Sequence, residues 1–402
     1  MAEQNRVIII GAGASGLAAA VSCADAGGEV TVLEAGKKPA EKLRKTGNGK
    51  CNLMHFGPSD GAYCGAAPSF AEQVCSALPE EELLAFLLGC GIPVNNKNGL
   101  GYPWSEQAQG VSECLIRAAR KRGARIRTST AVTGIGKEAQ GFCVFTGDWS
   151  YPADRVILAC GSPASVPGAP SSGMLFLAEE AGLPVTPFYA ALVPLRTEEL
   201  PLKEWAGVRH DGCARLYADG QFIRSETGQF QFTDSGISGI AVFNLSLPAA
   251  PLLSEGKRVE LELDFFPEKR EDGIRGLIGE LLPEGEADCK DALRCLLPER
   301  MLPWAEGLWL KHGASGLAAA LKGLRFRVSG TGGISRAQVC GGGVLTGGIS
   351  SRTMESAACP GLFVTGEMLD VTGICGGWNL GFAFRTGILA GRAAARQVLK
   401  SL

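Results

Sequence analysis

The chain has 402 residues, enough for two or three domains, and 46% of them are hydrophobic against 20% charged. This composition is typical of a folded protein with a sizeable core and argues against an intrinsically disordered chain. The 39 basic and 41 acidic residues give a net charge of -2, so the overall charge gives no argument for a nucleic-acid partner.

The fourteen cysteines and three histidines limit the chemistry further. No cysteines form a C-x-x-C pair, and no Cys/His cluster has the spacing of a zinc or iron–sulfur site, so we predict no metal. The apolar run from Val7 to Ile10 is too short for a signal-peptide core or a membrane span, and no other run reaches that length. We therefore expect a cytoplasmic protein with no membrane partner.

The first elements in chain order alternate between strand and helix. Residues 6–10 form a short aliphatic run, residues 15–26 are mostly small helix-forming residues, and residues 29–33 form a second β run. This β–turn–α–β spacing predicts an α/β fold of the doubly wound, Rossmann-like type.

A complete dinucleotide-binding fingerprint lies inside this unit. Gly11, Gly13 and Gly16 form the pattern G-x-G-x-x-G after the first strand and at the start of the helix, with Ala14 and Ser15 between them. In this context the glycines allow a tight turn, a close approach to a pyrophosphate, and close packing of helix on strand. The helix N-terminus then favours the phosphates.

Glu34 ends the second strand, where a carboxylate bonds ribose hydroxyls. A glutamate at this position disfavours a 2′-phosphate, so the bound nucleotide is FAD or NAD. The basic, glycine-rich loop that follows can neutralise phosphate, approach a cofactor closely and offer amide groups to it. A solvated loop without a ligand is the alternative. The loop residues in question are Lys42, Arg44, Lys45, Thr46, Gly47, Asn48, Gly49, Lys50 and Asn52.

The rest of the chain predicts a split domain. Helices are expected over residues 69–88 and 108–122, and strands over 125–130, 141–145 and 155–160. Short β segments follow up to about residue 265, and a helical stretch up to about 321. The expected division is a first FAD-binding segment over residues 1–190, an inserted β-rich domain with a small helical subdomain over 191–325, and a second FAD-binding segment over 326–402.

A second sequence, over residues 313–320, repeats residues 13–20 letter for letter. No aliphatic strand precedes it, and no acidic strand end follows at the expected distance. It therefore predicts the start of a helix rather than a second nucleotide site.

The second FAD-binding segment carries its own polar motif. A strand over residues 361–365 runs into Gly366 and Glu367, and a glycine-rich turn after Asp370 leads into a helix at about Asn379. Glu367 or Asp370 is expected to bond ribityl hydroxyls, and the N–H groups of Asn379 and Leu380 to face the flavin's N1/O2 edge. Two further expected cofactor contacts are Val132 and Gly161.

Together these motifs resemble the bacterial NAD(P)/FAD-dependent oxidoreductases of the aminoacetone oxidase family, which includes a bile-acid-inducible 3-dehydro-bile-acid reductase. Beyond the fingerprint, the markers are residues 47–52, 191–195, 232–239, 341–344, 353–356 and 366–379. The resemblance implies non-covalent FAD and an inserted domain over the flavin. The chain departs from the family loop Ser-Gly-Gly-Gly-Arg-Cys-Asn at Thr46, Asn48 and Lys50, so the geometry near the flavin ring is expected to differ.

Three functions stay open from the sequence. The leading one is an NAD(P)H-dependent reductase of a conjugated C=C bond in an apolar enone, such as a 3-oxo-Δ4 or Δ6 bile acid. The others are a flavin amine oxidase that produces peroxide, and a redox-sensing flavoprotein without turnover. Because only one dinucleotide fingerprint exists, NADH or NADPH is expected to bind transiently. The partner is expected to be a small-molecule substrate, and neither the oligomeric state nor a catalytic residue is indicated.

Candidate acid/base residues can nevertheless be named: His55, Tyr63, Tyr102, Tyr189 and Glu367. A set of aromatic residues is expected either to wall an apolar substrate pocket or, as is more common, simply to fill the core. Its members are Phe188, Tyr189, Trp205, Phe230, Phe232 and Trp304.

Overall fold

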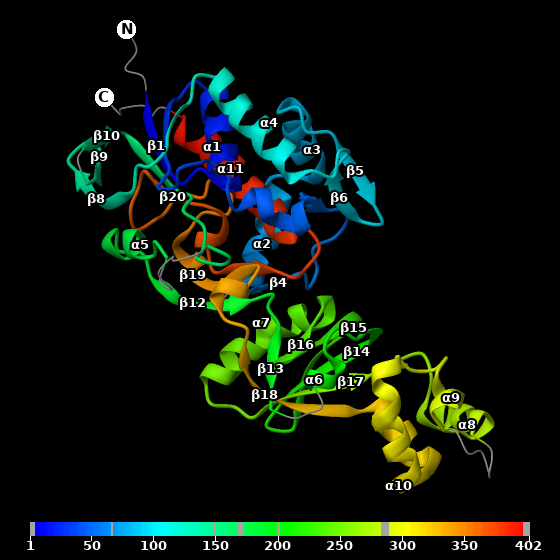
Figure 1. Cartoon of the computed structure of the whole chain (residues 1–402). Helices are drawn as coiled ribbons and strands as arrows, with labels where there is room; N and C mark the ends of the chain where they lie inside the picture. Colours follow the sequence, from blue (N-terminus) through cyan, green and yellow to red (C-terminus); the bar gives the residue numbers. More distant parts are fainter. Residues whose placement is uncertain are drawn as a thin grey trace. The chain divides into compact units, whose positions relative to one another are not determined.

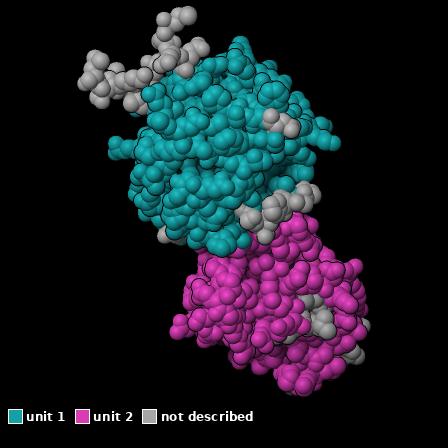
Figure 2. All heavy atoms as spheres, turned by 90° about the vertical axis from the view of Figure 1, so that its left-hand side faces the viewer, with its two compact units in different colours: residues 1–188, 339–402 teal, residues 189–338 magenta. Residues whose placement is uncertain are grey.

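The computed structural model of the chain describes residues 5–65, 67–147, 149–166, 173–198, 202–282 and 289–396. The chain divides into two compact units, of which the first joins Met1–Phe188 to Val339–Leu402 and the second is Tyr189–Gln338 (Figure 2). The first unit is thus built from both ends of the chain. The chain returns to it at Val339 rather than at residue 326, where the sequence placed the boundary.

A five-stranded parallel sheet forms the centre of the first unit (Figure 1). Its strand order is β20 (Leu362–Val364), β11 (Arg155–Leu158), β1 (Arg6–Ile10), β2 (Glu29–Leu33) and β7 (Arg125–Arg127). Strand β1 lies in the middle, and its aliphatic side chains are buried because both faces of the strand are covered. The predicted α/β, Rossmann-like fold class is confirmed.

Helices α1 (Ala14–Asp25) and α11 (Trp378–Ala394) pack along each other (Figure 1). Glycines make this close approach possible, since a Cβ atom at Gly387 would lie 2.2 Å from the backbone oxygen of Ser15. Helix α4 (Ala108–Lys121) also contacts α1. The C-terminal helix α11 therefore packs directly against α1, the helix that follows the glycine fingerprint.

Smaller elements complete the first unit. The predicted helix over residues 69–88 is two helices, α2 (Pro68–Ala77) and α3 (Glu80–Gly89), because Pro79 lies between them as the N-cap of α3. One three-stranded sheet has the strand order β3 (Met54–His55), β6 (Leu100–Pro103) and β5 (Val94–Lys97). A second has the order β10 (Ser150–Ala153), β9 (Gly141–Thr146) and β8 (Val132–Glu138). The remaining elements are β4 (Tyr63–Gly65) paired with β21 (Val371–Gly373), β12 (Val185–Ala191) paired with β19 (Val339–Val344), and α5 (Phe176–Glu180).

The second unit is a closed β-barrel with helices. The barrel order is β13 (Leu195–Thr197), β16 (Gly236–Ser238), β15 (Gln221–Thr233), β14 (Arg209–Ala218), β17 (Val259–Asp264) and β18 (Leu324–Thr331), and β18 closes it by pairing with β13. The helices of this unit are α6 (Leu202–Trp205), α7 (Ile240–Ser254), α8 (Glu271–Leu281), α9 (Cys289–Leu293) and α10 (Leu302–Lys322). The predicted β-rich insertion with a helical part is confirmed.

Two sequence expectations are settled in this unit. Strand β18 belongs to the barrel rather than to the second FAD-binding segment, because Phe326 and Val328 on one face of it are buried in the barrel core. Trp205, Phe230 and Phe232 are also core residues, at most 1% exposed. The interpretation of these three aromatics as core is therefore correct.

The segment that repeats the fingerprint sequence lies within α10. The helix is interrupted at Gly313, which has a φ of 62° and a non-helical ψ of -167°. A second helical run starts after this break, as the sequence predicted. Within the described ranges, no helix is both long enough and apolar enough to cross a membrane.

Candidate functional site

The turn between β1 and α1 has the geometry of a phosphate-binding loop. Gly11 has a φ of +103°, its N–H donates to the Leu33 oxygen at 2.8 Å, and a Cβ there would lie 2.4 Å from the Ala159 oxygen. At Gly16 a Cβ would lie 2.0 Å from the Gly11 oxygen, so close packing requires both glycines. Gly13 differs, because a Cβ there would meet nothing within 4 Å. Open space therefore lies in front of the helix N-terminus.

Helix α1 begins at this open space. Gly13 is the N-cap, and Ala14 and Ser15 occupy the first turn, where backbone N–H groups lack acceptors within the helix. These N–H groups and the helix dipole favour an anion. Ser15 also approaches the second FAD-binding segment, since a Cβ at Gly366 would lie 2.8 Å from its hydroxyl oxygen. The arrangement fits a diphosphate.

Glu34 is fixed next to the turn by two backbone groups. Its Oε2 accepts from the Ala12 N–H at 2.8 Å, and its Oε1 accepts from the Gly36 N–H at 2.7 Å. A carboxylate has about four acceptor positions, so one on each oxygen stays available for ribose hydroxyls. The position of Glu34 therefore fits the ribose-binding role expected from the sequence.

The expected contact Val132 starts strand β8 near Glu34. The Thr130 N–H donates to the Glu34 backbone oxygen at 2.8 Å, and the Ser129 N–H donates to the Gly36 oxygen at 2.9 Å. Val132 follows two residues later and is 4% exposed. The segment that leads into Val132 therefore lies beside the nucleotide end of the site. A direct contact between Val132 and the cofactor stays a prediction.

A cluster of three polar side chains joins the two FAD-binding segments. Lys42 Nζ lies 2.5 Å from Glu367 Oε2 and 3.2 Å from Ser162 Oγ, and the Ser162 hydroxyl donates to Glu367 Oε2 at 2.8 Å. Ser162 directly follows Gly161, which has a φ of +68° and lies three residues beyond the end of β11. Ser162 was not among the residues expected from the sequence, although its position after a glycine that follows a strand was a usable signal.

Asp370 does not join this cluster. Its Oδ2 accepts from the Thr186 hydroxyl at 3.2 Å, and its side chain is 6% exposed. Gly366, by contrast, is held by the Thr386 hydroxyl, which accepts from the Gly366 N–H at 3.0 Å. From the sequence, either Glu367 or Asp370 was expected to bond the ribityl hydroxyls. In the structure it is Glu367 that lies next to Lys42, another residue expected to bind the cofactor.

The loop after Glu34 contains η1 (Leu43–Gly49), a 3₁₀ segment whose second half departs from helical backbone angles. Gly47, Asn48 and Gly49 all have positive φ, of 56°, 52° and 85°. Asparagine tolerates this conformation better than most residues, which explains how Asn48 stands where the family has glycine. The hydroxyl of Thr46 donates to the Leu43 oxygen at 2.7 Å.

Several expected side chains have structural partners. Lys50 lies 3.2 Å from Glu106, and Arg44 donates to the Pro39 oxygen at 2.8 Å. With its amide oxygen toward the Gly377 N–H, Asn52 also donates to the Met54 and Gly101 oxygens at 3.1 and 3.2 Å.

The side chain of Asn379 makes two bonds of 2.8 Å to the Gly373 backbone. The side chains of Asn52 and Asn379 therefore hold backbone in place, and direct cofactor contacts from them stay predictions.

The comparisons with known proteins agree with this geometry. Residues 5–393 match the family described as "HI0933-like protein Rossmann domain". The chain belongs to this family. It is 37% identical to the 3-dehydro-bile acid delta(4,6)-reductase of Clostridium scindens, over 98% of this chain and 100% of the relative. It is 28% identical to a ribosomal RNA dihydrouridine synthase of Escherichia coli, over 95% and 96%.

Among solved structures, the chain is similar to a 3-ketosteroid-delta4-(5alpha)-dehydrogenase from Rhodococcus jostii, with 16% identity, a TM-score of 0.47, and coverage of 99% and 98% of the two chains. The resemblance drawn from the motifs is confirmed, and family membership makes this protein a FAD-dependent oxidoreductase. The expected metal-free chemistry stays a prediction. In the described part of the chain, no group of three or more His, Cys, Asp or Glu residues is arranged to hold a metal ion.

Two of the acid/base candidates meet at the start of α11. His55 stacks on Trp378 with ring centroids 4.3 Å apart, and Tyr63 contacts the same ring edge-on at 5.7 Å. Gly377, with a φ of +93°, is the N-cap, so the N–H groups of Asn379 and Leu380 lie in the first turn. The structure therefore brings His55 and Tyr63 to the helix end where the flavin N1/O2 edge is expected.

These two side chains differ in how they are bonded. The Tyr63 hydroxyl donates to the Trp378 oxygen at 3.3 Å, and burial raises the pKa of Tyr63 well above its usual value. The Nδ1 atom of His55 is buried and has no hydrogen-bond partner. Glu367 lies apart with Lys42, Tyr102 is on β6, and Tyr189 belongs to the second unit. A buried nitrogen without a partner is unusual and makes His55 the candidate to test first.

Proposed function

We propose that this flavoprotein is an NAD(P)H-dependent reductase that adds hydrogen across a C=C bond conjugated to a carbonyl group in an apolar enone, with 3-oxo-Δ4 and Δ6 bile acids as the substrate class. The observation that carries the proposal is the 37% identity to a bile acid delta(4,6)-reductase over nearly the full length of both chains. The name of the 28% identical relatives, dihydrouridine synthase, also describes hydrogen added to a double bond. Both names therefore favour reduction of a C=C bond to a CH–CH group.

When bound, FAD supplies hydride transfer, which no side-chain cluster of the chain provides by itself. The α1 N-terminus would hold its diphosphate, and Glu34 would hold its ribose. Lys42, Ser162 and Glu367 form the polar cluster suited to the hydroxyl groups between diphosphate and ring. In this arrangement the chain's residues bind and orient the cofactor.

His55 is the proposed proton source for the carbon next to the carbonyl group. The stack on Trp378 fixes its imidazole ring, and its buried Nδ1 has no hydrogen-bond partner among the described residues. Imidazole is suited to proton transfer near neutral pH. A His55→Gln variant should keep FAD and its reduction by NAD(P)H but lose most of the oxidative half-reaction, and the pH profile of that half-reaction should flatten.

The decisive experiment is anaerobic and separates the candidate functions. Purified protein should carry about one FAD per chain, as expected for one Rossmann site. Its flavin should be reduced by NADH or NADPH in stopped flow, and a 3-oxo-Δ4 bile acid should then reoxidise it and gain two hydrogens, as seen by mass spectrometry. If a small amine instead reduces the flavin and oxygen yields peroxide, the protein is an amine oxidase. If neither donor reduces it, a redox-sensing flavoprotein is the better description.

A uridine in RNA is the second candidate substrate, because two relatives at 28% identity are named ribosomal RNA dihydrouridine synthases. The same reduced enzyme should be mixed with ribosomal RNA under identical conditions. Formation of dihydrouridine, together with no turnover of the bile acid, would replace the steroid substrate by RNA.

A further inference from the structure

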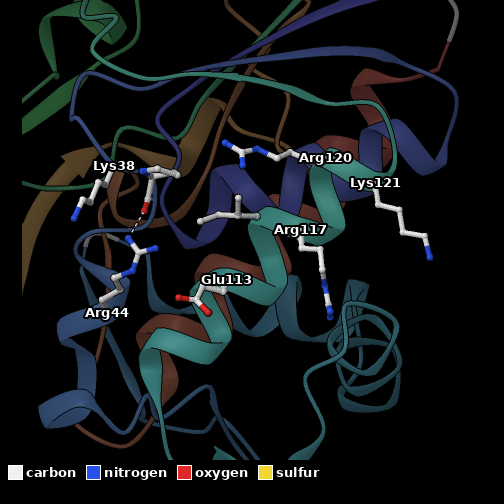
Figure 3. A pocket seen from close by; sticks show the side chains of 8 residues that line it. Lys38, Arg44, Glu113, Arg117, Arg120 and Lys121 are labelled. Carbon is white, nitrogen blue, oxygen red and sulfur yellow. Dashed lines mark hydrogen bonds between the residues drawn. The ribbon is translucent and has the colours of Figure 1, made fainter.

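A basic groove of about 730 Å³ lies on the first unit, between the loop after Glu34 and helix α4 (Figure 3). Pro39 and Ile116 give it apolar surface. Its charged lining residues are Lys38, Arg44, Glu113, Arg117, Arg120 and Lys121. Five cations against one carboxylate, in a volume typical of small-molecule sites, indicate an anionic ligand of modest size.

The exposed cations of this groove have no acidic partner among the described residues. Four of the lining cations are exposed and form no ion pair within the described ranges: Lys38, Arg117, Arg120 and Lys121. The next two arginines along the chain do, since Arg122 lies 2.6 Å from Asp25 and Arg125 lies 2.9 Å from Glu29. Like charges repel one another, and an anion bound in the groove would offset this repulsion.

Arg44 supplies a second, independent observation. Its Nη1 donates to the Pro39 oxygen at 2.8 Å, but its Nε is buried and has no hydrogen-bond partner. Figure 3 shows Lys38 and Arg44 on the loop side and the other labelled side chains along α4. A buried guanidinium N–H without an acceptor is costly. The positive charge of this same side chain lines the groove and adds to its attraction for an anion.

We propose that this groove binds the 2′-phospho-ADP end of NADPH, and so makes NADPH the preferred electron donor; this rests on the proposed function. The fingerprint cannot serve this purpose, because Glu34 disfavours a 2′-phosphate where ribose binds. Arginine clusters recognise phosphate monoesters, and NADPH carries about four negative charges against about two for NADH. The groove adjoins the cofactor site, since Arg44 lies in η1 and Lys42 is the N-cap of this segment, two residues earlier.

The test uses FAD-loaded protein and measures binding without any flavin reduction. The wild-type protein should bind 2′,5′-ADP in calorimetry, and the double variant Arg117→Glu/Arg120→Glu should bind it at least about tenfold more weakly. Arg275→Glu, an exposed arginine on helix α8 of the second unit, is the matched control and should not change binding. In steady state, the double variant should raise the KM for NADPH by a clearly larger factor than the KM for NADH, because only NADPH carries the 2′-phosphate.

Three results would overturn the proposal: no binding of 2′,5′-ADP to wild-type protein, equal binding of 5′-ADP, or a single-stranded RNA oligonucleotide that binds more tightly and loses affinity in the same double variant. The last result would assign the groove to RNA instead. Because binding is measured without substrate, the outcome does not depend on whether the enone is reduced. Failure of the reductase proposal and failure of the groove proposal are therefore distinguishable.

Discussion

The Glu34 carboxylate accepts a hydrogen bond from the Ala12 backbone N–H at 2.8 Å, inside the glycine fingerprint. The same carboxylate accepts from the Gly36 N–H at 2.7 Å. The residue expected to bind ribose thus also fixes the turn expected to bind diphosphate. The two parts of the nucleotide site form one rigid unit, because a change in either one alters the hydrogen bonds of the other.

Replacing Glu34 with alanine should weaken FAD binding by about 1.5–3 kcal/mol, because a charge-assisted bond to ribose is lost. The dissociation constant of FAD for the apoprotein, followed by flavin fluorescence, measures this. Glu29→Ala is a suitable control, since Glu29 starts the same strand but pairs at the surface with Arg125. A Glu34→Ala protein with the wild-type dissociation constant would reject Glu34 as the ribose ligand.

Lys42 and Glu367 should act on FAD binding as a pair. Lys42→Met leaves a partly buried carboxylate without its cation, and Glu367→Gln leaves the cation without its carboxylate. In a double-mutant cycle on FAD affinity, we expect a coupling of about 0.5–3 kcal/mol. The exposed pair Arg392–Glu82 is the control and should show no coupling on FAD affinity. Fully additive effects of the Lys42 and Glu367 variants would show that the contact is not used.

Local patterns predicted the nucleotide half of the fold well. The strands over residues 6–10 and 29–33 are observed with the same limits, because each is a short aliphatic run ended by a polar or glycine residue. The helix expected at Asn379 begins one residue earlier, at Trp378. Such features depend on neighbouring residues, so the sequence specifies them directly.

Features that depend on distant residues could not be predicted in this way. Ser162 is a functional candidate only because Lys42 and Glu367, far away in the chain, meet it. The contact of Arg44 with FAD stays a prediction, and the groove that this residue lines together with α4 could not be predicted from the sequence. Strand β18 was assigned partly to the wrong domain because its alternating pattern does not say which sheet it joins. Each of these features depends on contacts between segments that are far apart in the sequence.

Gly387→Ala should destabilise the protein by about 1–3 kcal/mol and weaken FAD binding. The new methyl group would lie 2.2 Å from the Ser15 backbone oxygen and would push α11 away from the fingerprint helix. Gly279→Ala on α8 is the matched control, because a Cβ there meets nothing within 4 Å. That variant should be stabilised by about 0.5–1 kcal/mol through helix propensity. Urea denaturation measures both, and equal stability of the two variants would contradict the packing argument.

Three buried thiols should make the protein less stable in alkaline solution. Burial raises the pKa of the Cys23 thiol from 9.0 to about 12, and that of Cys51 and Cys90 to about 11. All three side chains are at most 3% exposed. The folded state therefore keeps these thiols protonated at pH values where the unfolded chain ionises them.

A pKa that is higher in the folded state contributes stability below the unfolded value, and this stability is lost as the pH rises through the folded value. The free energy of unfolding should thus be level up to pH 9.0 and fall between there and about 11 to 12. The slope should reach up to about 1.4 kcal/mol per pH unit for each thiol. Urea denaturation across this range measures it. Cys23→Ala should reduce the slope, whereas Cys295→Ser, at an exposed cysteine, should not. An unchanged slope in Cys23→Ala would mean that this thiol ionises alike in both states.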